Sequence, residues 1–181
     1  MKALLLAGLV ALAADAPVPT DKLVAILVRS LAYDRSLEAR AGDAVVVAVL
    51  SNHEPGSRTE AAAVMSAFKA FSSARVLGRP LKAVAVDWTG EDALDAVISA
   101  NGVDAVFVCP GLELDLGAIA EVAHRRKVST LTSVPDFVEK GIALGVTAED
   151  GKPRLVVNLT ASRAEGSQLS SELIGLARVI R

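Results

Sequence analysis

The chain has 181 residues, of which 52% are apolar, 3% aromatic and 22% charged. This composition is typical of a globular protein with a core of small aliphatic side chains, and it excludes an intrinsically disordered chain. The 19 basic and 21 acidic residues leave a net charge of −2. Because phosphate contacts require a basic surface, this balance excludes nucleic acid as a bulk partner.

The first residues have the pattern of a secretory signal peptide. Lys2 precedes the apolar run Ala3–Leu12, and small residues follow at the positions where signal peptides are cut. We expect a signal peptide over residues 1–13, with a second cleavage site after Ala16 that Pro17 disfavours. The alternative is a buried first helix of a cytoplasmic protein. The run is too short for a bilayer span, which takes about 20 apolar residues, so the mature protein is expected to be soluble in the periplasm.

Four apolar runs rich in β-branched residues predict strands that are buried on both faces. These strands are Ala44–Leu50, Leu81–Val86, Asp104–Cys109 and Val128–Thr132. Segments with helical spacing of apolar residues lie before and between them. These helices are Lys22–Leu37, Thr59–Phe71, Glu91–Ala100 and Leu114–Arg126. Alternating strands and helices predict a parallel sheet with helices on both faces.

The pattern changes near the C-terminus. Two strand-like runs, Ile142–Glu149 and Arg154–Leu159, flank Asp150-Gly151, which is a strong signal for a hairpin turn. A last helix is expected over Ser170–Val179, with Leu173, Leu176, Ala177 and Ile180 on one side. The fold class is therefore predicted as α/β: a Rossmann-like three-layer sandwich with a mostly parallel sheet that ends in an antiparallel hairpin. We expect one domain over residues 17–181.

Patterns typical of catalytic or cofactor sites are missing from the sequence. No G-x-G-x-x-G follows a strand, so a dinucleotide has no phosphate-binding turn. The two histidines, His53 and His124, lie on separate segments and provide too few ligands for zinc. His53-Glu54 follows the first strand, where a solvated pair is the more common interpretation. We therefore predict no enzyme, no cofactor and no metal.

Cys109 is the only cysteine, so the chain forms no internal disulfide. One interpretation is a small buried residue at the end of its strand. The other is a reactive thiol or an intermolecular bridge, although no basic neighbour in the sequence lowers the pKa of this thiol.

Ligands of open parallel sheets bind beyond the carboxyl ends of the strands. Polar side chains and one tryptophan follow the predicted strands at this edge. The candidate ligand- or partner-binding residues are Ser51, Asn52, Asp87, Trp88, Cys109, Thr132 and Ser133.

The first helix has a wider apolar arc than one face requires. Beyond Leu23, Ile26 and Leu27, it carries Val24 and Val28, which we predict as interface candidates because leftover apolar surface commonly marks a partner contact. The alternative is a helix packed between two neighbours inside the domain.

The second half of the chain resembles the YfiR/HmsC-like periplasmic proteins. The resemblance rests on Asp104–Cys109, Val128–Ser133 and Gly141–Val146, and above all on Gly151–Leu159 and Leu169–Arg178. The motif positions, which we interpret as structural, are Asn158, Leu169, Ser170, Ser171, Leu173, Leu176 and Ala177. The chain departs from the pattern in its single cysteine, because the best-known branch uses cysteine pairs.

The resemblance implies an exported Rossmann-like domain that often forms homodimers and has no catalytic residues. In the best-known branch, the protein represses an inner-membrane diguanylate cyclase by binding its periplasmic sensor region and so lowers cyclic-di-GMP output. We therefore expect a periplasmic regulator whose partner is an inner-membrane sensor, either a diguanylate cyclase or a kinase. The alternative is a periplasmic domain that binds a small ligand and serves a transporter or sensor.

Overall fold

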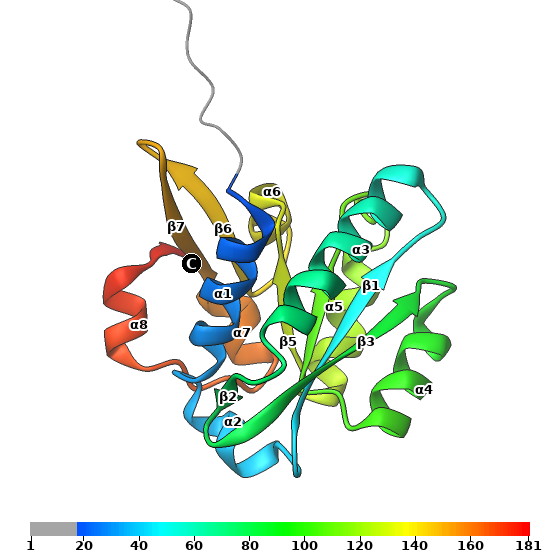
Figure 1. Cartoon of the computed structure of the whole chain (residues 1–181), viewed down its shortest axis with the longest axis horizontal. Helices are drawn as coiled ribbons and strands as arrows, with labels where there is room; N and C mark the ends of the chain where they lie inside the picture. Colours follow the sequence, from blue (N-terminus) through cyan, green and yellow to red (C-terminus); the bar gives the residue numbers. More distant parts are fainter. Residues whose placement is uncertain (1–17) are drawn as a thin grey trace, which may run out of the picture.

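Strands and helices alternate along residues 18–181, which are the residues that the computed structural model describes (Figure 1). The predicted signal peptide lies outside them. The helices are α1 (Thr20–Leu31), α2 (Arg35–Arg40), α3 (Pro55–Ala70), α4 (Glu91–Asn101), α5 (Leu116–Arg126), α6 (Pro135–Glu139), α7 (Leu159–Ala164) and α8 (Ser171–Leu176). The strands are β1 (Val45–Ser51), β2 (Arg75–Val76), β3 (Arg79–Asp87), β4 (Ala105–Val108), β5 (Ser129–Thr132), β6 (Leu144–Glu149), β7 (Lys152–Asn158) and β8 (Arg178–Ile180).

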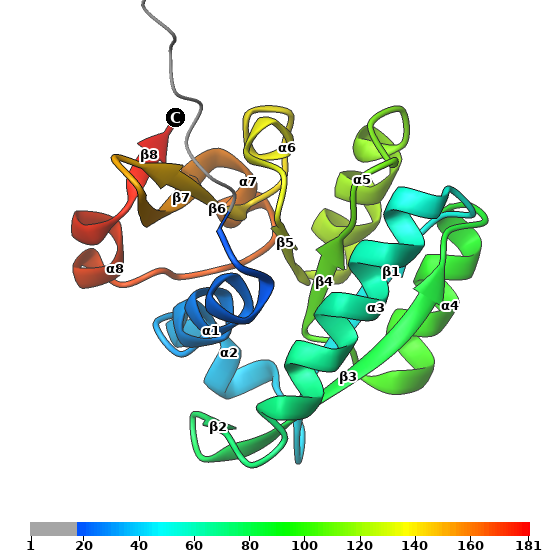
Figure 2. The ribbon, with the colours of Figure 1, turned by 45° about the horizontal axis from the view of Figure 1, so that its top comes forward.

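All the strands belong to one sheet with the order β2-β3-β1-β4-β5-β6-β7-β8. Strands β3, β1, β4, β5 and β6 run parallel to one another, whereas β6 and β7 form an antiparallel hairpin. Figure 2 shows α1 and α3 on one face of the sheet and α4 and α5 on the other. The predicted α/β fold with a mostly parallel sheet is confirmed.

The core lies on both faces of the sheet, and β1 shows why its sequence is continuously apolar. Val45, Val47 and Val49 pack with residues of α1 and α3, whereas Val46 and Leu50 pack with residues of α4 and α5. Successive side chains of a strand point to opposite faces. Because both faces are covered by helices, every residue of β1 is buried.

The predicted helix over Lys22–Leu37 is two helices. The α1 helix ends at Leu31, and α2 begins at Arg35 after the buried Asp34. The Asp34 carboxylate accepts hydrogen bonds from the backbone N–H of Ser36 at 3.0 Å and of Gln168 at 2.8 Å. Aspartate competes well for backbone donors at a helix start. The side chain of Asp34 therefore caps α2 and binds the distant C-terminal segment.

At the C-terminus, the hairpin is confirmed and the last helix is shorter than predicted. Asp150 and Gly151 have φ angles of +52° and +69°, as a two-residue hairpin turn requires. The predicted helix over Ser170–Val179 ends at Leu176, and Arg178–Ile180 form β8, which runs parallel to β7. The β-branched Val179 and Ile180 favour this strand. The sheet therefore continues one strand beyond the hairpin.

Candidate functional site

The carboxyl ends of the central strands meet at one edge of the sheet, as the sequence predicts. The backbone N–H of Trp88 donates to the carbonyl of Ser51 at 2.7 Å, and the N–H of Cys109 donates to the carbonyl of Leu50 at 3.0 Å. These bonds place the ends of β3, β1 and β4 side by side. The predicted site residues on these strands are therefore neighbours.

Three of the predicted binding residues are buried at this edge. The exposed fraction is 6% for Ser51 and 0% for both Cys109 and Thr132. The Thr132 hydroxyl donates to the carbonyl of Val108 at 2.9 Å, and burial raises the pKa of Cys109 to about 12. A ligand at this edge would not reach these three side chains, which corrects the prediction for them. The interpretation of Cys109 as a buried core residue is confirmed.

Asn52 also has a structural role. Its amide nitrogen donates to the carbonyl of Gly111 at 2.5 Å, and its amide oxygen accepts the N–H of Glu54 at 3.0 Å. Gly111 has a φ of +88°, and a Cβ atom there would lie 2.9 Å from the Glu54 carboxylate. The loops after β1 and β4 are therefore held together by a hydrogen bond. Of the predicted residues, Asp87 is exposed at this edge, and Asn52, Trp88 and Ser133 are partly exposed.

Val24 and Val28, the predicted interface candidates, are buried. Val24 is 0% and Val28 8% exposed, because α1 packs between α3 and the β6–β7 hairpin. The helix is thus packed between neighbours inside the domain, which was the alternative interpretation. The remaining apolar surface of α1, at Ala25, Ile26 and the small exposed part of Val28, lines a groove of about 470 Å³.

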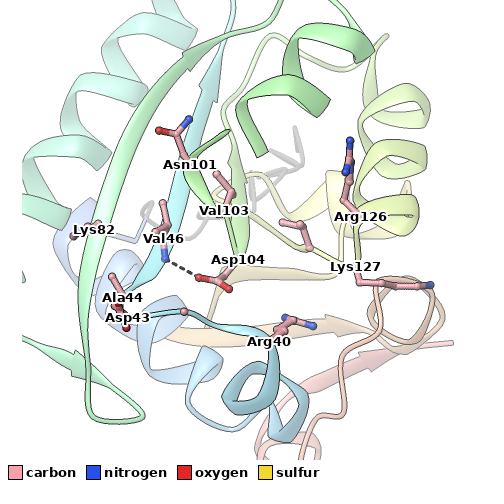
Figure 3. A pocket seen from close by; sticks show the side chains of 13 residues that line it. Arg40, Asp43, Ala44, Val46, Lys82, Asn101, Val103, Asp104, Arg126 and Lys127 are labelled. Carbon is pink, nitrogen blue, oxygen red and sulfur yellow. Dashed lines mark hydrogen bonds between the residues drawn. The ribbon is translucent and has the colours of Figure 1, made fainter. Parts of the chain in front are cut away.

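A cavity of about 470 Å³ lies at the opposite edge of the sheet, where the strands begin (Figure 3). Its lining includes four cations from separate segments: Arg40, Lys82, Arg126 and Lys127. Asp104 lies between them and is 5% exposed. Burial raises the pKa of its carboxyl, one oxygen of which accepts the backbone N–H of Val46 at 2.9 Å.

Most of these cations are bound within the chain. Arg40 donates to Asp34 at 2.9 Å, Arg126 forms a two-point ion pair with Asp95, and Lys127 Nζ donates to the carbonyl of Ala164 at 2.9 Å. Of the four, only Lys82 has neither an ion pair nor a side-chain hydrogen bond within residues 18–181. The cavity cations therefore stabilise the adjacent loops and helix ends. Within the described residues, no group of three side chains is arranged to hold a metal ion.

A buried polar network, which no local sequence pattern predicts, joins this edge to the C-terminal segment. Arg40 donates to the Ser129 hydroxyl at 2.9 Å, and Ser129 contacts the Ser167 hydroxyl at 3.0 Å. Next to them, Glu165 is 0% exposed and accepts the backbone N–H of Thr130 at 2.9 Å. Burial raises the pKa of Glu165 to about 8, against the lowering effect of the bonds from Thr130.

The family-motif residues are mostly structural, as predicted. The Asn158 side chain caps α7 by accepting the N–H of Ala161 at 3.0 Å, and Ser170 caps α8 by accepting the N–H of Leu173 at 3.3 Å. Leu173 is buried in the core, whereas Leu176 is 63% exposed. The prediction that Leu176 docks on the domain is wrong, because the chain leaves the helix at that residue to form β8. The other motif positions are Leu169, Ser171 and Ala177, of which Leu169 and Ala177 pack against the core.

Solved structures with a similar fold include a substrate-binding protein and a domain in complex with an amino acid. A conserved domain protein from Vibrio cholerae superposes with a TM-score of 0.63 at 16% identity and covers 92% of this chain and 61% of its own. An ABC domain in complex with L-Trp from Streptococcus pneumonia has a TM-score of 0.58, 15% identity and coverages of 90% and 60%. A ligand-free substrate-binding protein from Clostridium difficile has a TM-score of 0.56, 17% identity and coverages of 80% and 57%. The chain thus spans about three fifths of each of these proteins, and the likeness shows the fold alone.

No curated protein matches the sequence. Within residues 18–181, none of the helices has both the length and the apolar character needed to cross a membrane. A family model described as YfiR/HmsC-like matches residues 24–178, which run from α1 to the first residue of β8. That family consists of regulatory rather than catalytic proteins. The chain therefore belongs to the YfiR/HmsC-like family.

Proposed function

We propose that the protein is a periplasmic, non-enzymatic regulator that binds and represses a membrane-bound sensor, such as a diguanylate cyclase. The family match over residues 24–178 carries this proposal. In this role the protein lowers cyclic-di-GMP output by holding the sensor region of its partner in an inactive state.

The chemistry of the two sheet edges supports a binding role. At the carboxyl edge, Asn52 ties Gly111 and Glu54 together, and at the amino edge Arg40 and Arg126 are each paired with a carboxylate. Polar groups that bind one another stabilise loops and keep a surface in one shape. A fixed surface loses little conformational entropy when a partner protein docks on it.

Photo-crosslinking in living cells tests for the partner. Leu114 is 99% and Leu176 63% exposed, so a benzoylphenylalanine at either position replaces a side chain without disturbing the core. We expect irradiation to join the protein to an inner-membrane protein with a periplasmic region. The matched control is the same variant without residues 1–13, which should stay in the cytosol and lose that product.

The result that contradicts the proposal is the absence of any membrane-protein product from both positions while the protein is present in the periplasm. A third crosslinker at Ala62, on the exposed side of α3, extends the test to another face of the molecule. Absence of a membrane-protein product from all three positions would contradict a sensor partner that docks on any of these three faces.

A second candidate function is a domain that binds a small ligand and serves a transporter or sensor. The observation in its favour is the shared fold with binding proteins, one of which is described in complex with L-Trp. Thermal shift measurements with a panel of amino acids test this function. A stabilisation that depends on ligand concentration would favour it, because ligands that bind only the native state raise the melting temperature.

A further inference from the structure

Strand β3 lies near one side of the sheet and has a long unpaired edge. The strand has nine residues, but its outer neighbour β2 pairs only with Arg79 and Pro80. From Leu81 to Asp87, β3 pairs with β1 on one side, and no described strand pairs with the other. Figures 1 and 2 show this part of β3 on the outside of the sheet. We call residues 81–87 on this side the β3 edge.

The backbone of the β3 edge presents hydrogen-bonding groups to the outside. The N–H of Trp88 donates to Ser51 of β1, so the even-numbered residues of β3 direct their backbone groups toward β1. Backbone groups alternate in direction along a parallel strand. The N–H and C=O groups of Ala83, Ala85 and Asp87 therefore point away from the sheet. Each of these residues offers one donor and one acceptor to an added strand.

The β3 edge has few of the features that prevent strand pairing. Natural edge strands are usually protected by proline, bulges, short length or inward-pointing charges. Residues 81–87 contain no proline or glycine, and Ala83 and Ala85 are small enough to let another backbone approach. Ala85 is exposed. Lys82 is the one charged residue before the terminal Asp87.

A groove of about 430 Å³ runs beside this edge, between β3 and α3. Met65 and Phe68 of α3 and Leu81 and Ala83 of β3 supply its apolar lining. Leu81 and Ala83 pack with the α1 and α3 side of the core, so this is the face to which alternate side chains of an added strand would point. The groove therefore offers space for apolar side chains at every second position of such a strand.

The charges beside the edge indicate the chemistry of the occupant. Lys69 lines the groove on one face of the sheet, and Lys82 lines the amino-edge cavity on the other. Neither forms an ion pair with residues 18–181. A strand with acidic residues complements both lysines.

We infer that the β3 edge binds an extended apolar segment with acidic residues, contributed by the partner protein as an added strand. Main-chain hydrogen bonds to Ala83, Ala85 and Asp87 provide the affinity, and the groove and the two lysines select the sequence. The inference rests on the proposed function for the existence of a protein partner. It adds the position and chemistry of the contact.

A synthetic peptide tests the site without the natural partner. The probe is a capped seven-residue peptide of alternating valine and glutamate, and the control replaces glutamate by lysine. We expect the acidic peptide to shift the amide NMR signals of Ala83, Ala85 and Asp87 and to slow their hydrogen exchange. The affinity for the basic peptide should be about tenfold lower, because like charges repel.

Two variants at one position separate backbone pairing from side-chain effects. Ala85→Pro removes an outward N–H without affecting a bond to β1, whereas Ala85→Thr keeps that N–H in a residue that favours strands. We expect the proline variant to lose binding and the threonine variant to retain it. Folding of both is checked by the amide spectrum away from β3. Lys82→Glu should weaken binding of the acidic peptide and strengthen binding of the basic one, because the charged side chains of both peptides point to the face on which Lys82 lies.

Three results would overturn the inference. These are no binding at millimolar peptide, equal binding by the proline and threonine variants, or protection of the same amides by self-association in the absence of peptide. The last result would assign the edge to a second copy of the chain. If the peptide binds but no sensor partner is found in cells, the proposed function fails and the site remains.

Discussion

The buried Glu165 makes folding stability depend on pH in an unusual direction. Its carboxyl has no exposed surface and contacts the backbone N–H and the hydroxyl of Thr130. The charged groups that act on it are Arg40 and Asp34, and burial raises its pKa from 4.5 to about 8. The folded chain therefore holds this proton more tightly than the unfolded chain does.

The size of the effect follows from the two pKa values. One pKa unit corresponds to about 1.4 kcal/mol, so the shift from 4.5 to about 8 corresponds to about 5 kcal/mol. This stabilisation is fully present below pH 4.5 and is lost as the pH rises through about 8. Folded domains of this kind have a total stability of about 5–15 kcal/mol, so the loss is large enough to measure easily.

Glu165→Gln removes the titration and keeps an amide of similar shape. We expect urea unfolding, followed by the fluorescence of Trp88, to show a stability that falls between pH 5 and pH 8 in the wild type and falls much less in the variant. The matched control is Glu172→Gln, at an exposed position of α8, which should keep the wild-type slope. Parallel slopes for the wild type and Glu165→Gln would show that Glu165 does not cause the pH dependence.

Three further predictions follow from the buried groups. Arg40→Ala leaves Asp34, which is 1% exposed, without its counterion and should cost about 3 kcal/mol in urea unfolding; a cost below about 1 kcal/mol would contradict this. The Cys109 thiol should react with a disulfide reagent only as fast as the protein unfolds, and reductant should leave the melting temperature unchanged; fast labelling of the native protein would show that the thiol is accessible. Gly111→Val places a side chain against Glu54 at a positive φ and should lower stability by about 2 kcal/mol, whereas an unchanged midpoint would show that the loop adjusts.

The sequence predicts those parts of the fold that are determined by residues close together in the chain. Apolar runs such as Val45–Leu50 have one structural solution in this setting, a strand buried between two helix layers. Asp150-Gly151 specifies a tight hairpin because both residues tolerate positive φ. The end of α4 at Gly102, in the left-handed region, is a similar case.

Features that depend on distant partners were not predicted. Asp34 ends a helical pattern because Gln168, far along the chain, donates to its carboxylate. Residues 178–180 become a strand because β7 offers them an open edge. The Asp34-Arg35-Ser36 sequence before Leu37 does carry the signature of a helix N-cap, which could have indicated the break between α1 and α2.

The same distinction applies to the candidate site, where the position of the residues is predictable but their exposure is not. Strand topology correctly places Ser51, Asp87, Trp88 and Cys109 at one edge, since parallel strands share their carboxyl ends. Whether each side chain is exposed there depends on packing that the sequence does not display, and Ser51 and Cys109 are buried. Glu165 had no sequence signal at all, because an isolated glutamate before a glycine is usually on the surface.

The most direct test of the regulatory role is the cyclic-di-GMP content of cells that lack this protein. We expect a rise on deletion, a return to the original level with the full chain, and no return with a chain from Ala14 onward that lacks the export signal. Ala14 as the first residue of the periplasmic protein, read by N-terminal sequencing, is the expected companion result. An unchanged cyclic-di-GMP content on deletion, with the protein present in the periplasm of the parent strain, would contradict repression of a diguanylate cyclase.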